Sequence, residues 1–74
     1  MFRVQMYENP IGKDDARQLV SDNLSEFVER SEAVNWVQNY IAGYGHSGYE
    51  GQQDSWWCRN DGDQVVKTLV IRAN

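Results

Sequence analysis

Apolar and polar side chains alternate at the start of the chain. From Phe2 to Tyr7, every second residue, beginning with Phe2, is apolar. This period of two is typical of a strand with one buried face. A cluster of turn-forming residues follows at Asn9–Gly12 and contains the only proline, Pro10. We therefore predict a strand over residues 2–8. Its outward side would carry Arg3, Gln5 and Tyr7.

The segment from Asp14 to Arg30 fits two patterns. Its apolar residues recur at helical spacing, and Asp14 or Asp15 would be a suitable cap for such a helix. However, Ser21–Asn23 is a run of weak helix formers. A helix unbroken from Asp15 to Ala42 would also be about 42 Å long, much longer than the first strand. We favour a second strand with a turn at Ser21–Asn23, and a broken pair of helices is the alternative.

The clearest helix begins after Ser31. Ser31 is a suitable N-cap, and Glu32 follows in the first turn, where an acidic residue is favourable. Apolar residues recur at helical spacing over residues 33–41, and Gly43 ends the pattern. The nine residues Gly43–Gly51 include four glycines, which favours a loop over a helix or strand.

A hairpin is predicted near the end of the chain. Asp61 and Gly62 separate two runs of strand-forming residues, as in a two-residue type I′ turn. That turn would pair Cys58 with Val65, Trp57 with Val66, Trp56 with Lys67 and Ser55 with Thr68. Trp56 and Trp57 would then lie on opposite faces of the sheet.

The two faces of this hairpin differ in composition. One face is mostly apolar and should pack on the helix; it would carry Trp56, Cys58, Val65, Lys67, Leu69 and Ile71. The other mixes aromatic, cationic and β-branched side chains: Ser55, Trp57, Arg59, Gln64, Val66, Thr68, Val70 and Arg72. One helix covers only one face of a small sheet. Burial of a side chain as large as Trp57 is worth about 2 to 3 kcal/mol, so an occupant of the second face would add substantially to stability. The alternative is a face without an occupant, on which Arg59 and Arg72 stack over Trp57 in water.

These elements predict a single α+β domain over residues 1–74. The expected order is ββαββ, with an antiparallel sheet of three to four strands packed on one main helix. The order βααββ is the alternative if residues 14–30 are helical. The chain's 74 residues suffice for one small core, and its 12% aromatic content is too high for a disordered segment.

Charge and cysteine content restrict the classes of partner. Seven basic and eleven acidic residues give a net charge of −4, which disfavours tight binding to nucleic-acid phosphates. No apolar run approaches the roughly 20 residues of a membrane-spanning helix, and no signal peptide is evident. Cys58 has no second cysteine to pair with, and His46 alone does not complete a zinc site. We expect a soluble, cytoplasmic protein with no cofactor, no metal and no membrane contact.

No catalytic motif is evident in the sequence. His46 lacks a partner that would make it a general base, and Cys58 is predicted to point into the core, where a thiol is inert. The glycines of residues 43–51 follow a helix, whereas those of phosphate-binding loops follow a strand. We therefore predict that the protein is not an enzyme.

The predicted function is a non-enzymatic protein-binding or regulatory module. Its binding residues would come from the aromatic and arginine side chains of the outward face and from the glycine-rich segment: Tyr7, Trp57, Arg59, Arg72, Tyr44, His46 and Tyr49. A homodimer would cover the same face. The alternative is a module for single-stranded nucleic acid, in which aromatic rings stack on bases and arginines contact phosphates. The acidic net charge makes nucleic acid the less favoured partner.

Overall fold

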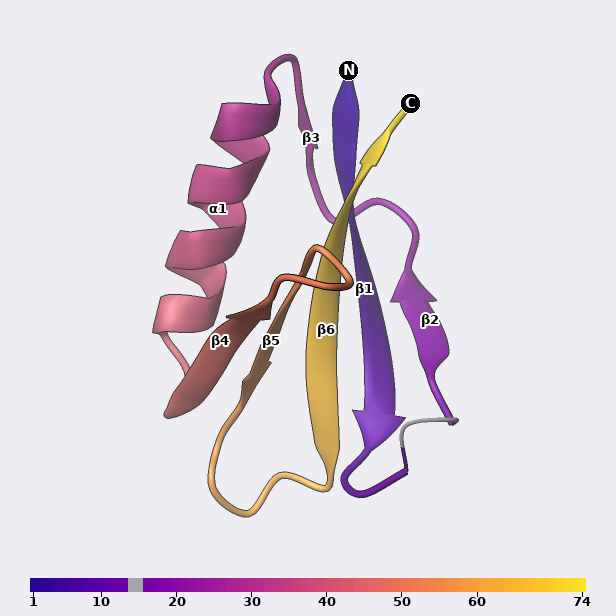
Figure 1. The fold of residues 1–74 in the computed structure, drawn as a ribbon, viewed down its shortest axis with the longest axis vertical. Coiled ribbons are helices and arrows are strands. Elements are labelled where there is room, and N and C mark those ends of the chain that lie inside the picture. Colours follow the sequence, from indigo (N-terminus) through magenta and orange to yellow (C-terminus); the bar gives the residue numbers. More distant parts are fainter. Residues whose placement is uncertain (14–15) are drawn as a thin grey trace.

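The computed structural model describes residues 1–13 and 16–74. Within them the chain forms six strands and one helix in the order βββαβββ (Figure 1). The elements are β1 (Phe2–Pro10), β2 (Gln18–Ser21), β3 (Glu26–Phe27), α1 (Arg30–Ala42), β4 (His46–Glu50), β5 (Ser55–Arg59) and β6 (Val65–Ala73). The α+β class is confirmed, but the predicted order ββαββ and a sheet of three to four strands were too simple.

The sheet is antiparallel, and its strands lie side by side in the order β2-β1-β6-β5-β4. β1 and β6 pair along their full length, from Phe2 with Ala73 to Pro10 with Val65. The two ends of the chain therefore lie close together (Figure 1). β1 begins where the alternating pattern predicted and extends two residues further than the predicted end at residue 8.

The region after Pro10 forms two short strands. β2 pairs with the second half of β1, whereas β3 pairs with Phe2 and Arg3 at its beginning. The chain bends at Asp22 between β2 and β3, within the predicted turn. The strand interpretation of this region was correct, and the pair of helices was wrong. The helix cap considered at Asp14 or Asp15 lies outside the described residues.

Helix α1 begins two residues earlier than expected. Its N-cap is Glu29 rather than Ser31, and the backbone N–H of Glu29 donates to Oε1 of Glu32 at 3.0 Å. This contact is part of a capping box, in which a glutamate three residues into the helix satisfies a backbone donor at its start. Gly43 ends the helix, as predicted.

The prediction of a loop over Gly43–Gly51 was wrong. Strand β4 lies within this segment and pairs with β5, with Gly48 opposite Trp57. A Cβ atom at Gly48 would lie 2.7 Å from Nε1 of the Trp57 indole, which is too close for any real contact. The glycine is therefore used for close packing of a neighbouring ring within the sheet, and not for a turn.

The hairpin between β5 and β6 has a longer connection than two residues. The N–H of Asp63 donates to the carbonyl of Asn60 at 3.1 Å, so a β-turn is centred on Asp61 and Gly62. Gly62 has a φ of +85°, whereas Asp61 is not among the residues with positive φ. A type I′ turn needs positive φ at both positions, so this part of the prediction was wrong.

The register of the hairpin is shifted by two residues from the predicted one. Cys58 lies opposite Lys67, Trp57 opposite Thr68, Trp56 opposite Leu69 and Ser55 opposite Val70. Because side chains alternate with a period of two, an even shift leaves every residue on its predicted face. Trp56 and Trp57 therefore do lie on opposite faces of the sheet.

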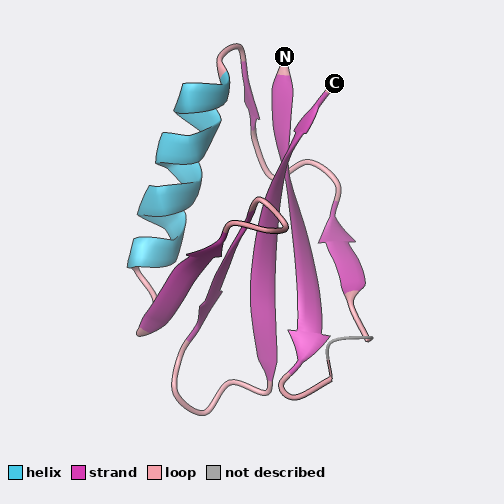
Figure 2. Ribbon diagram, viewed as in Figure 1, coloured by secondary structure: helices cyan, strands magenta, loops and turns pink. Residues whose placement is uncertain are grey.

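The core lies between α1 and one face of the sheet (Figure 2). It consists of Val4, Ala33, Val37, Ile41, Trp56, Cys58 and Leu69. Full burial of one large apolar side chain contributes about 1.5 to 3 kcal/mol, so this layer provides most of the driving force for folding. At 13 residues, α1 is too short to cross a membrane, and no helix in the described part of the chain meets that requirement.

Candidate binding face of the sheet

The face of the sheet that points away from α1 is called the outer face below. The strand pairings place on it Arg3, Gln5, Tyr7 and Asn9 of β1, Val66, Thr68, Val70 and Arg72 of β6, Ser55, Trp57 and Arg59 of β5, and His46, Gly48 and Glu50 of β4. The one helix formed by residues 1–13 and 16–74 packs on the opposite face. The outer face is therefore not covered by a helix of the described chain.

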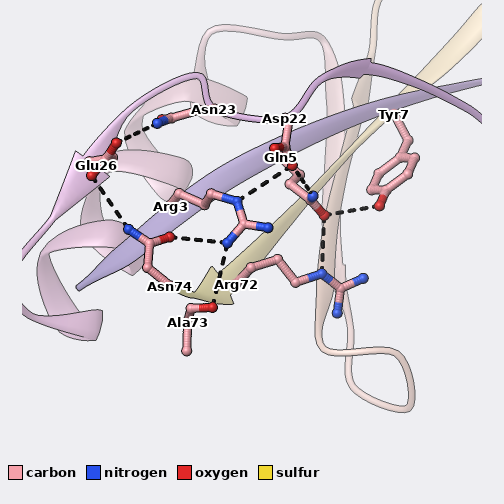
Figure 3. Close-up of polar contacts among 9 residues, drawn as sticks. All are labelled: Arg3, Gln5, Tyr7, Asp22, Asn23, Glu26, Arg72, Ala73 and Asn74. Carbon is pink, nitrogen blue, oxygen red and sulfur yellow. Dashed lines mark hydrogen bonds and ion pairs between the residues drawn. The ribbon is translucent and has the colours of Figure 1, made fainter.

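A polar network centred on Gln5 covers one end of the outer face (Figure 3). Oε1 of Gln5 accepts hydrogen bonds from the hydroxyl of Tyr7 at 2.9 Å and from Nε of Arg72 at 3.1 Å. Its Nε2 donates to the carboxylate of Asp22. Gln5 is only 7% exposed, and a buried amide without partners would cost about 1 to 3 kcal/mol. These contacts allow a polar side chain to be buried without a helix above it.

Arg3 joins the same network from the neighbouring position. Its Nη1 donates to Oδ1 of Asn74 at 3.0 Å, and its Nε lies 3.4 Å from Oδ1 of Asp22. The hydrogen bond from Gln5 is the main cause that lowers the pKa of the Asp22 carboxyl, and the charge of Arg3 adds to the effect. Arg3 and Arg72, which are cross-strand partners, are thus both bound to groups of the chain itself.

One cross-strand row of the outer face is buried. Gln5, Val70 and Ser55 lie side by side on β1, β6 and β5, and they are 7%, 5% and 4% exposed. This part of the face is already packed by its neighbours. The accessible part lies beside it, around Trp57, which is half-buried.

A groove of about 300 Å³ lies at this position on the outer face. Its walls are formed by Asn9, Arg17, Glu50, Gln53, Ser55, Trp57 and Thr68. These residues come from β1, β6, β5 and β4 and from the segments beside β2 and β5, so the groove runs across the strands. The lining is mainly polar, and the indole of Trp57 is its one aromatic surface.

Gly48 determines where the indole of Trp57 lies. A Cβ at Gly48 would approach Nε1, Cε2 and Cζ2 of the ring within 2.7 to 3.0 Å, so the ring packs directly against the glycine backbone. The absence of a side chain at Gly48 therefore gives the indole room to lie against β4 on the outer face.

The two ends of the groove carry opposite charges. The guanidinium of Arg17 lies over the ring of Tyr7, with its Cζ 4.0 Å from the ring centroid, in a cation–π contact. At the other edge of the sheet, Oε1 of Glu50 accepts a hydrogen bond from the N–H of Gln52 at 3.1 Å. Sequence reasoning missed Arg17 because it lies in the segment whose secondary structure was ambiguous.

Asn9 lines the groove, but its side-chain oxygen is buried. No donor among residues 1–13 and 16–74 reaches this Oδ1 atom. A buried acceptor of this kind costs about 1 to 3 kcal/mol relative to a hydrogen-bonded one.

Two of the predicted binding residues lie on the helix side of the sheet instead. The hydroxyl of Tyr44 accepts a hydrogen bond from Nζ of Lys67 at 3.0 Å and donates to the hydroxyl of Tyr40 at 3.4 Å. The hydrogen bond to Tyr44 also raises the pKa of Lys67. Tyr49 packs on Trp56, with ring centroids 4.9 Å apart. Tyr44 and Tyr49 are therefore separated from Tyr7, Trp57 and the arginines by the sheet.

His46 lies on the outer face but is engaged in another contact. Its Nε2 lies 2.7 Å from Oδ1 of Asp61, and this hydrogen bond lowers the pKa of the Asp61 carboxyl. The pair links β4 to the loop after β5. Arg59, the cross-strand partner of His46, is half-buried beside it.

Cys58 is fully buried on the helix side, and burial raises the pKa of its thiol to about 11. The thiol is therefore protonated at neutral pH, and the reactive form of cysteine is the thiolate. His46 and Cys58 lie on opposite faces of the sheet, so the imidazole has no route to the sulfur.

Neither a metal site nor a similar protein indicates the function of this chain. Within the part of the chain that the structure describes, no group of three or more His, Cys, Asp or Glu side chains is arranged to hold a metal ion. Comparison of the chain with protein-family models, curated proteins and solved structures finds no match in any of the three. Function is therefore inferred from the geometry of the outer face.

Proposed function

We propose that this chain is a non-enzymatic binding module that recognises a protein partner through the outer face of its sheet. The observation that carries this proposal is the groove of about 300 Å³ beside Trp57, on the face that α1 leaves uncovered. Ligand sites begin at about this volume. Tryptophan is also enriched among the residues that provide most of the binding energy at protein interfaces.

A protein partner suits this face better than a nucleic acid. Arg3 and Arg72 donate to groups of the chain itself, so fewer of their N–H groups are available for phosphates. Glu50 lines the groove and would repel a phosphate, and the net charge of the chain is −4. Protein interfaces, in contrast, commonly combine aromatic anchors with both signs of charge.

The state of Cys58 and His46 supports a role without catalysis. A thiol with a raised pKa is a poor nucleophile, and the imidazole is paired with Asp61 at the surface. A single buried cysteine also suits a reducing compartment, and we place the protein in the cytoplasm on that ground.

The proposal is tested by comparing captured proteins across three forms of the chain. Wild type, the double variant Trp57→Ala/Arg59→Ala and the control Tyr49→Ala are immobilised and exposed to lysate of the source cells. Tyr49 is an exposed aromatic residue on the other side of the sheet, so its replacement removes a ring without altering the outer face. A partner retained by wild type and Tyr49→Ala but lost by the double variant supports the proposal.

The same set of captured proteins for all three forms would contradict it, provided that circular dichroism shows the double variant to be folded. Light scattering of the purified chains then identifies self-association. A wild-type dimer that becomes a monomer in the double variant would make a second copy of the chain the partner.

A further inference from the structure

The charges at the two ends of the groove indicate in which direction an occupant would lie. Arg17 lies at the β1 end and Glu50 at the β4 end, so a segment that binds along the groove meets a cation first and an anion last. Three inter-strand gaps separate β1 from β4 in the order β1-β6-β5-β4. At about 4.8 Å per gap, the two ends are about 14 Å apart.

An extended peptide matches this distance. Extended chain advances about 3.4 Å per residue, so about four residues cover the length of the groove. Side chains at positions i, i+2 and i+4 point to the same side of such a peptide. Two charged residues four positions apart would therefore both face the sheet.

The two ends suit particular side chains. At one end, the indole of Trp57 and the carboxylate of Glu50 line the same groove, and together they suit a guanidinium, which stacks on aromatic rings and donates to carboxylates. At the other end, the ring of Tyr7 supports Arg17, whose N–H groups suit a carboxylate in a paired arrangement.

The middle of the groove suits a peptide backbone. Ser55 and Thr68 line it with hydroxyl groups, which both donate and accept hydrogen bonds. A fully apolar occupant would leave these groups unpaired.

We infer that the outer face binds a short extended peptide segment with an arginine at Glu50 and an acidic residue four positions away at Arg17. The segment crosses the strands, and Trp57 contacts the arginine. This inference rests on the proposed function and deepens it by naming the occupant.

The test is an NMR titration of ¹⁵N-labelled protein with the peptide Ac-Gly-Arg-Thr-Ser-Thr-Glu-Gly-NH₂. The indole N–H signal of Trp57 is followed, and those of Trp36 and Trp56 serve as internal references because both rings pack on the helix side. Control peptides carry alanine in place of the arginine or of the glutamate. We expect Trp57 to shift most with the parent peptide.

Protein variants then assign the two ends. Glu50→Gln should weaken binding of the parent peptide about fivefold but leave binding of the peptide without arginine unchanged. Arg17→Gln should likewise weaken binding of the parent peptide, but it should leave binding of the peptide without glutamate unchanged. Glu8→Gln is the matched control, because Glu8 is a strand glutamate on the helix side and should have no effect.

Two results would overturn the inference and leave the proposed function intact. One is an equal shift of the Trp57 signal with the parent peptide and both control peptides, because the charged residues of the peptide would then not contribute to binding. The other is no shift of Trp57 with any peptide, while the partner captured from lysate still depends on Trp57 and Arg59. A shift of Trp57 with oligothymidine or cellohexaose but not with peptide would overturn both.

Discussion

The two faces of this sheet are stabilised in different ways. On the helix side, Val4, Val37 and Leu69 are fully buried in an apolar layer. On the outer face, Gln5 and Ser55 are almost as deeply buried, although they are polar and no helix in the described chain covers them. Gln5 is buried with its amide hydrogen-bonded to Tyr7, Asp22 and Arg72, and it lies beside Val70, which is 5% exposed. The helix side is thus an apolar layer, whereas the outer face mixes a polar network with one buried apolar residue.

The open groove also lies on the outer face. The network around Gln5 covers one end of the face, and the groove begins where that network ends, near Trp57. The domain can therefore fold with one face still available to a partner.

The largest expected effect compares two neighbours on β6. Leu69→Ala should lower the free energy of unfolding by about 3 kcal/mol, because it opens a cavity under α1. Val70→Ala should cost only about 1 kcal/mol, because the site borders the outer face and can collapse. Urea denaturation measures both. Equal losses would mean that the outer face is a second hydrophobic core.

The second prediction concerns the polar network. Gln5→Ala should lower the free energy of unfolding by about 2 kcal/mol, because Arg72 loses its hydrogen bond to Gln5 and Asp22 keeps only its contact with Arg3. Tyr7→Phe removes one of the donors to Gln5 and should cost about 0.5 to 1 kcal/mol. If Gln5→Ala were neutral in thermal and urea denaturation, the network would not be what stabilises this end of the face.

The third prediction concerns the position of the indole. Gly48→Ala should cost about 1 kcal/mol and shift the indole signal of Trp57, because the added methyl group displaces the ring. In the Trp57→Ala background the same substitution should be neutral. A double-mutant cycle by urea denaturation measures this coupling. An equal cost in both backgrounds would show that the ring does not lie on Gly48.

The smallest expected effect is on the dependence of stability on pH. The folded chain holds the pKa of Asp22 below its ordinary value of 3.8, so this group stabilises the fold above that pH. The contribution is lost as the pH falls through the lowered folded value. Asp22→Asn should therefore be less stable than wild type near neutral pH, and the difference should shrink on acidification. Melting temperatures between about pH 5 and about pH 2.5 check this. A constant difference would contradict the assigned contact.

The sequence was most informative where one period dominates. Alternation is clear in β1, which begins where that pattern predicted. The hairpin prediction also placed Trp56 and Trp57 of β5 on the correct faces, even though its register was shifted by two residues. The face on which a side chain lies depends only on whether its position in the strand is odd or even. The residue that it pairs with depends on the length of the turn. The local pattern around Gly62 did not determine that length.

The remaining features depend on contacts between distant segments. Gly48 looks like a loop residue until Trp57 is known to lie against it. β2 and β3 have four and two residues, too few for a clear period. The groove joins Asn9 and Arg17 to residues more than thirty positions away, so no local pattern could have indicated it.

The central claim is that Trp57 is held on an accessible face while its neighbour Trp56 is buried. The most direct measurement is ¹⁹F NMR of 5-fluorotryptophan-labelled protein with a soluble paramagnetic gadolinium chelate. Assignments come from Trp57→Phe and Trp56→Phe. We expect strong broadening of the Trp57 signal and little broadening of the Trp56 signal, because Trp56 is only 5% exposed. Equal protection of the two signals would contradict it.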